Sequence, residues 1–68
     1  MKYSELVRKL RRLGVVLDEQ RKRHEYWHYP KNNSYPAIPR HHSGEIPTGT
    51  LENILKDLGI GKDELRDA

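Results

Sequence analysis

Two apolar stripes at helical spacing, one near each end of the chain, limit the folds open to this sequence. The stripes are Leu6, Val7, Leu10 and Leu13 in the first, and Leu51, Ile54, Leu55 and Leu58 in the second. This spacing places apolar side chains on one side of a helix, where they must pack against another element. Gly14 and Gly59 follow the stripes, as glycine does where helices end. We therefore predict two amphipathic helices, with Ser4 as the N-cap of the first.

The chain between these helices is predicted to be extended. Residues 15–20 begin with β-branched side chains and residues 24–29 are rich in aromatics, which favours two strands, while residues 21–23 and 30–33 suit turns. Residues 34–38 form a third extended segment, which contains Pro36 and is closed by Pro39. Because proline cannot donate to a sheet ladder, this segment suits a sheet edge.

The order helix, strand, strand, strand, helix predicts a single α+β domain over residues 1–68. Strands joined by short turns pair antiparallel, so both helices would cover one face of a three-stranded antiparallel sheet. The other face would be open to solvent. Residues 62–65 predict one further helical turn anchored by Leu65, and residues 66–68 are expected to fray. With 68 residues the core must be thin.

Composition narrows the class of protein. The chain has no cysteine, which excludes disulfides and thiolate zinc sites and fits a reducing cytoplasm. No apolar run approaches the roughly 20 residues of a membrane span, and the N-terminal segment is charged where a signal peptide is apolar. We therefore expect a cytoplasmic protein with no membrane partner.

The net charge of +3 hides a segregation of charge along the chain. Lys and Arg outnumber Asp and Glu in residues 1–24, and the reverse holds in residues 45–68. This asymmetry favours a basic face for a polyanion, although a solvated helix face explains it equally well. The cations of the first helix, Arg8, Lys9, Arg11 and Arg12, fit either interpretation.

Four histidines raise the possibility of a metal site, which the spacing argues against. His24 and His28 are four residues apart, which would bring them together in a helix but leaves them roughly 13 Å apart in a strand. The adjacent pair His41 and His42 would need further ligands that nothing in the sequence specifies. We predict no metal and no cofactor.

Strand alternation divides residues 24–29 between two faces. His24, Tyr26 and His28 share one face, and Glu25, Trp27 and Tyr29 share the other. The large Trp27 side chain suits the core, with Tyr29 beside it and Glu25 near the rim. His24 would then lie on the open face.

An exposed histidine there is either plain polar surface or a group that moves protons. Imidazole, with an ordinary pKa near 6.5, can take a proton from an RNA 2′-hydroxyl near neutral pH. Lys22 and Arg23 would hold the phosphate and offset its developing charge. Tyr26 and Tyr35 could stack bases if they face outward, although simple packing is the favoured explanation of each.

Several segments in order resemble the HicA toxin family, the small mRNA-cleaving toxins of HicA and HicB toxin-antitoxin pairs. The resemblance covers roughly residues 3–60. It rests on the segments 4–10, 13–15, 28–30, 38–41 and 46–51, and on Ile54-Leu55 and Leu58-Gly59-Ile60. Proline and histidine in the loop, Gly49-Thr50 and Ile54-Leu55 together make a specific combination.

The resemblance implies a double-stranded-RNA-binding-like fold and a ribonuclease that works without a metal through one histidine at the start of the second strand. By position that histidine is His24. Where the family usually has Gly-Ser-His, this chain has Lys22-Arg23-His24. A HicB-like antitoxin would inhibit the toxin by covering His24 and the basic surface.

The leading hypothesis is an mRNA endoribonuclease toxin with His24 as general acid or base. Its expected RNA contacts are Lys22, Arg23, Tyr26, His28, Arg40 and His41. A second proton-transfer group stays open among His28, His41 and Tyr26. The alternatives are a non-catalytic RNA-binding module of the same fold, and a small interaction domain with no nucleic-acid partner.

Overall fold

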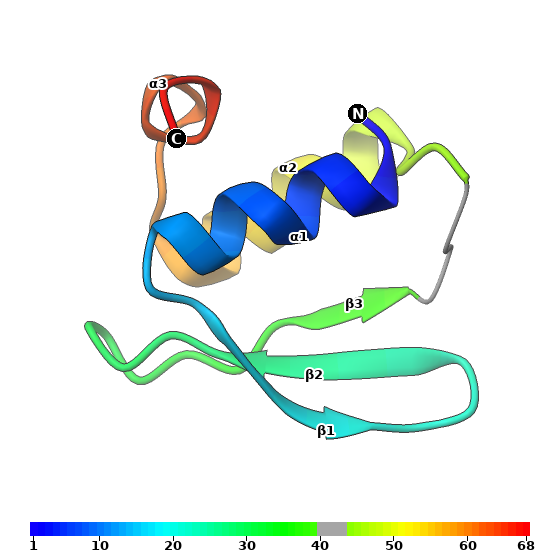
Figure 1. The fold of residues 1–68 in the computed structure, drawn as a ribbon. Coiled ribbons are helices and arrows are strands. Elements are labelled where there is room, and N and C mark those ends of the chain that lie inside the picture. The colour runs from blue at the N-terminus through cyan, green and yellow to red at the C-terminus, as the bar shows by residue number, and fades with distance from the viewer. Residues whose placement is uncertain (40–43) are drawn as a thin grey trace.

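A computed structural model describes residues 1–39 and 44–68 of the chain. The elements in order are α1 (Tyr3–Arg12), β1 (Val16–Gln20), β2 (His24–His28), β3 (Ala37–Pro39), α2 (Thr48–Leu58) and α3 (Lys62–Arg66). Figure 1 shows α1 and α2 over one face of the sheet, with α3 beyond them and the other sheet face uncovered. The predicted α+β architecture is confirmed. Among the described residues, no helix has the length and apolar character that a membrane span requires.

The sheet has the order β1-β2-β3, and both pairings are antiparallel. Leu17 lies opposite Trp27 and Glu19 lies opposite Tyr26, so Asp18 is an extra residue that forms a bulge in β1. All five residues of β1 are exposed, as expected for an edge strand that the helices do not cover. β3, with Pro39 at its end, forms the opposite edge, as its prolines predicted.

The core lies between the two helices and the inner face of β2 and β3. Trp27 is 1% exposed, and Leu6, Leu10, Ile38 and Leu58 are fully buried. Both predicted apolar stripes supply core residues, and Leu65 anchors α3 as expected. Because the residues buried in β2 alternate with less buried ones, the sheet has one covered face and one open face.

The starts of α1 and β3 differ from the prediction. The N-cap of α1 is Lys2 and not Ser4, because Tyr3 is itself buried in the core and extends the helix backward. β3 begins only at Ala37, although a bridge between Tyr29 and Ser34 continues the pairing beyond the strand. The helix ends were predicted correctly, since Gly14 and Gly59 take left-handed φ values of 96° and 69°.

Glu25 was expected near the rim, and this was wrong: its side chain lies in the core, with the residue 2% exposed. The Tyr3 hydroxyl donates to its Oε1, and Gln20 Nε2 donates to its Oε2 at 3.0 Å. A buried carboxylate requires such donors, because leaving it without them costs several kcal/mol. Glu25 therefore joins the first turn of α1 to the ends of β1 and β2.

Replacing Tyr3 by Phe keeps the ring in the core and removes the hydroxyl that donates to Glu25. Hydrogen bonds to charged groups contribute about 1.5–3 kcal/mol, so we expect the free energy of unfolding to fall by about that amount. Urea unfolding followed by far-UV circular dichroism measures the change. Tyr35→Phe, at a position 53% exposed, is the matched control and should change stability little. Equal stability of the two variants would contradict the role given to Tyr3.

Candidate functional site

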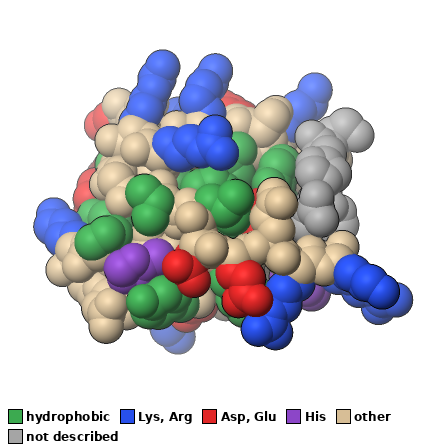
Figure 2. Space-filling view, turned by 60° about the horizontal axis from the view of Figure 1, so that its bottom comes forward, with side chains coloured by type: hydrophobic (Ala, Val, Ile, Leu, Met, Phe, Trp, Pro, Cys, Tyr) green, Lys and Arg blue, Asp and Glu red, His purple; other side chains and the backbone are tan. Residues whose placement is uncertain are grey.

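The open face of the sheet carries His24, Tyr26 and His28, as strand alternation predicted. His24 is exposed at the first position of β2, and Tyr26 and His28 are half-buried. Pro39 and Ala37 of β3 lie opposite His24 and Tyr26 and complete this face. Figure 2 shows histidine and hydrophobic side chains on this side of the molecule, with Lys and Arg side chains around its rim. We call this surface the open face.

His24 lies directly after the tip of the β1–β2 hairpin, where β2 begins. The Arg21 N–H donates to the His24 carbonyl at 2.9 Å, so only Lys22 and Arg23 lie between the closing residues. Both are exposed. Among the described residues, Asn33 is the only non-glycine with positive φ, so neither Lys22 nor Arg23 needs a glycine-like backbone. The hairpin accepts two long cations at its tip without backbone strain.

Arg21 lies on the open face. Its guanidinium carbon is 5.1 Å from the centroid of the Tyr26 ring, and its Nε lies 3.1 Å from Glu19 Oε1. The hydrogen bond and the negative charge of Glu19 raise the pKa of Arg21 above its usual value. A ligand approaching Tyr26 therefore meets a guanidinium over the ring, and Glu19 already partly neutralises its charge.

At the other end of β2, His28 and Tyr35 form an aromatic stack. Their ring centroids are 4.4 Å apart and the ring planes differ by 12°. His28 Nε2 lies 3.1 Å from Asn33 Oδ1, which holds the imidazole orientation. Tyr35 precedes β3, and the backbone pairs on either side of it place it opposite His28.

His24 and His28 occupy the two ends of β2, roughly 13 Å apart by strand geometry. Within residues 1–39 and 44–68, no three His, Cys, Asp or Glu side chains gather closely enough to hold a metal ion. Arg40 and His41, the other expected RNA contacts, lie outside the described residues. The structure brings Lys22 and Arg23 next to His24 along the chain, and places His28 apart from them.

The cations of α1 divide into structural and solvent-exposed groups. Lys9 Nζ donates to the carbonyls of Leu65 at 3.2 Å and Arg66 at 2.9 Å, where a cation satisfies the C-terminal end of α3. The guanidinium of Arg11 lies 5.4 Å from the Trp27 ring centroid, a cation–π contact at the surface of the core. Part of the charge segregation in the sequence therefore serves the fold.

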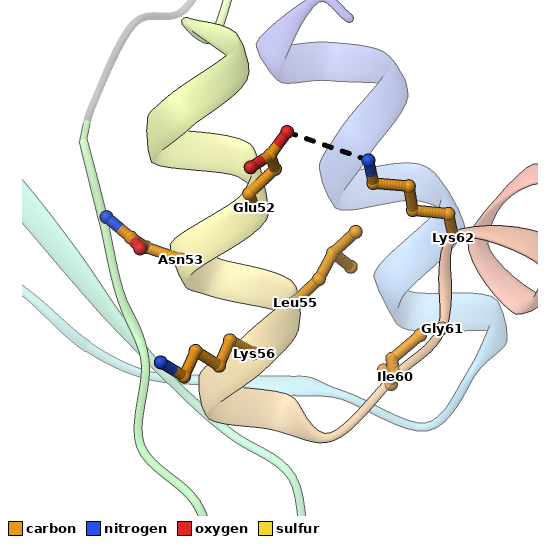
Figure 3. Close-up of a pocket in the computed structure, with 7 residues that line it drawn as sticks. All are labelled: Glu52, Asn53, Leu55, Lys56, Ile60, Gly61 and Lys62. Carbon is orange, nitrogen blue, oxygen red and sulfur yellow. Dashed lines mark ion pairs between the residues drawn. The ribbon is translucent and has the colours of Figure 1, made fainter.

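Two surface hollows lie away from His24. The larger, of about 520 Å³, lies between α2 and the segment leading to α3, and Leu55 and Ile60 are among its lining residues. Figure 3 shows Glu52 and Lys62 facing each other across it, with an ion pair of 3.6 Å. A smaller hollow of about 260 Å³ is lined by Tyr29, Asn32 and Leu58 among others. His24 thus lies on an open surface, and such a surface suits a long polymer better than a small molecule.

Sequence reasoning missed Arg21 and Asn33 as parts of the open face. Arg21 was treated as part of a basic turn, but it pairs with His24 across the hairpin and so lies diagonal to Tyr26. Asn33 was treated as a turn residue only. The signal for Arg21 was the hairpin register, whereas the Asn33 contact depends on a positive φ of 57° that no spacing rule would locate.

Comparison with known proteins supplies the family. The family model described as the HicA toxin of bacterial toxin-antitoxin systems matches residues 3–60. A search of curated proteins found no significant match. The matched residues run from the start of α1 to just beyond α2, and so include the whole sheet. The chain therefore belongs to the HicA toxin family of bacterial toxin-antitoxin systems.

Proposed function

We propose that this toxin is a metal-independent endoribonuclease that cleaves mRNA, with His24 as its general acid or base. HicA toxins are ribonucleases, and the proposal assigns that activity to a residue. The observation that carries it is the position of His24: exposed on an open surface, directly after two exposed cations. An imidazole with access to solvent can both take and give a proton near neutral pH.

The reaction assigned to His24 is transfer within the RNA strand. The imidazole removes the proton of a 2′-hydroxyl, and the 2′-oxygen forms a bond to the adjacent phosphorus. The bond from phosphorus to the 5′-oxygen then breaks, and that oxygen takes a proton. Lys22 and Arg23 lower the energy of the charge that builds up on the phosphate oxygens. The products are a 2′,3′-cyclic phosphate and a 5′-hydroxyl, with no redox change.

The distance from His24 limits which residue can donate the second proton. His28 is roughly 13 Å from His24 along β2, too far to act on the same phosphate. Tyr26 is two residues from His24 on the same face, and His41 belongs to the segment outside the described residues. We therefore favour Tyr26, His41 or His24 itself, after it has taken up the first proton, over His28.

Replacing His24 by Ala tests the catalytic assignment. We expect cleavage of single-stranded RNA in EDTA to fall about 10²- to 10⁴-fold, because general acid–base catalysis contributes that much. The measurement is the appearance of fragments on a denaturing gel, with the 2′,3′-cyclic ends identified by mass. His28→Ala is the matched control on the same strand and should keep the cleavage chemistry, with any loss confined to substrate binding. Equal cleavage by wild type and His24→Ala, or cleavage by neither, would refute the assignment.

Removing the hairpin cations tests their interaction with phosphate. In a His24→Ala background, which prevents turnover, Lys22→Ala/Arg23→Ala should weaken RNA binding. The slope of log affinity against log salt should become shallower by roughly one for each phosphate that the protein no longer neutralises. Arg8→Ala/Arg12→Ala on α1 removes the same charge elsewhere and should leave the slope nearly unchanged. An equal change in both double variants would show that net charge, and not the hairpin, attracts the RNA.

A second candidate function is a non-catalytic RNA-binding module. It is favoured by Lys22 and Arg23, where the family resemblance leads us to expect glycine and serine, since two added cations raise affinity for a polyanion. This alternative requires salt-dependent binding with intact RNA. The cleavage measurement on wild type separates it from the ribonuclease.

HicA toxins pair with HicB antitoxins, and we propose that the antitoxin of this chain covers His24 and the hairpin tip. Exposed cations at a binding surface chiefly accelerate association with a negatively charged partner. Lys22→Glu/Arg23→Glu should therefore slow association with the cognate antitoxin at low salt by about tenfold or more. Stopped-flow fluorescence measures the rate, and Arg8→Glu/Arg12→Glu is the control. Loss of association in the control alone would place the interface on α1.

A further inference from the structure

We propose that His28 and Tyr35 form a platform on which one base of the RNA strand stacks, at a distance from the cleaved phosphate. This inference rests on the proposed ribonuclease function and extends it to a base subsite. It concerns single-stranded RNA, because a base inside a duplex has both faces covered by its neighbours.

The platform is organised before any ligand binds. The two rings are nearly parallel at 4.4 Å, and Asn33 Oδ1 holds the imidazole edge at 3.1 Å. The turn that carries Asn33 is closed on both sides: the Tyr29 N–H donates to the Ser34 carbonyl at 3.0 Å, and Asn32 Nδ2 donates to the Leu58 carbonyl at 2.6 Å. A ring held in this way loses little conformational freedom when a base stacks on it.

Exposure leaves room for a base. Tyr35 is 53% exposed, although His28 already stacks against it. Val16, which lies opposite His28 on β1, is 50% exposed, so the apolar surface continues across the sheet. Covering apolar surface that is in contact with water lowers the free energy, so a base that stacks here is stabilised. Tyr26 is less suited, because the Arg21 guanidinium already lies over its ring.

Charge complementarity favours a nucleic acid as the occupant. Cations lie at the hairpin tip, near His24, while the stack lies at the other end of the same strand, roughly 13 Å away. A single strand presents alternating phosphates and bases and reaches across this distance in a few nucleotides. The Arg21 guanidinium lies over Tyr26, between the two ends, but its ion pair with Glu19 weakens its pull on phosphate. Phosphates would therefore bind at the tip, and a base at the stack.

The test measures binding of a short single-stranded RNA to full-length protein that carries His24→Ala, so that no cleavage intervenes. Adding Tyr35→Ala should weaken binding about tenfold, the usual size of one base–aromatic stack. Adding Tyr35→Phe, which keeps the ring, should leave affinity within about twofold of the parent. A series of RNAs with one abasic nucleotide at each position then locates the subsite. At one position, the abasic nucleotide should weaken RNA binding by the parent protein as much as Tyr35→Ala does. The same RNA should cause no further loss of affinity in the Tyr35→Ala protein.

The outcomes separate this inference from the proposed function. If Tyr35→Ala binds as tightly as the parent, or if every abasic position weakens both proteins alike, the platform is wrong, while His24-dependent cleavage can still hold. If Tyr35→Phe loses as much affinity as Tyr35→Ala, the hydroxyl and not the ring makes the contact, and stacking is wrong. A wild type that neither binds nor cleaves RNA would refute the proposed function and the platform together.

Discussion

The packing of Trp27 beneath α1 decides which face of β2 is inside, and therefore which residues can meet a substrate. A tryptophan buries about 150–250 Å², worth roughly 4–6 kcal/mol at about 25 cal/mol per Å². Among the described residues its Nε1 has no hydrogen-bond partner, which costs about 1–3 kcal/mol, so burial of the ring outweighs this cost. A slip of one residue would move Trp27 to solvent and His24 into the core. The exposure of His24 thus follows from the burial of a residue three positions away.

Glu25 supports the same arrangement through polar contacts. Its carboxylate lies directly after His24 in the chain but on the opposite face, where Tyr3 and Gln20 donate to it. These donors come from α1 and β1, so the start of β2 is held to both neighbouring elements. Because a carboxylate in the core is costly unless its donors stay in place, this end of the strand resists displacement. The face that carries His24 is therefore backed by a fixed strand, as the proton transfer that we propose for His24 requires.

Periodicity was enough to predict the elements and their layers, because a thin core leaves few other ways to bury the two apolar stripes. It was not enough to find contacts made between elements. Ser4 was predicted as the N-cap because nothing local shows that α1 already begins at Tyr3. Tyr3 is buried, and its burial depends on the packing of the whole core. Glu25 looked like a rim residue because its donors come from two other elements. The alternation in β2 was predictable, but the stacking of Tyr35 on His28 needed the pairing beyond β3, which an isolated bridge supplies.

The two cations at the hairpin tip, Lys22 and Arg23, would affect binding of both proposed partners, the RNA and the antitoxin. Where the resemblance leads us to expect glycine and serine, Lys22 and Arg23 take backbone angles open to any residue, so the turn itself does not require the smaller pair. The difference then acts through charge. In the proposed function, two exposed cations next to His24 in the chain would attract RNA phosphates, and they would attract a negatively charged antitoxin surface for the same reason. If both partners use the tip, binding of one must exclude the other, and the added charge strengthens substrate and inhibitor together. Inhibition would then depend less on the charges themselves than on contacts that only the antitoxin makes.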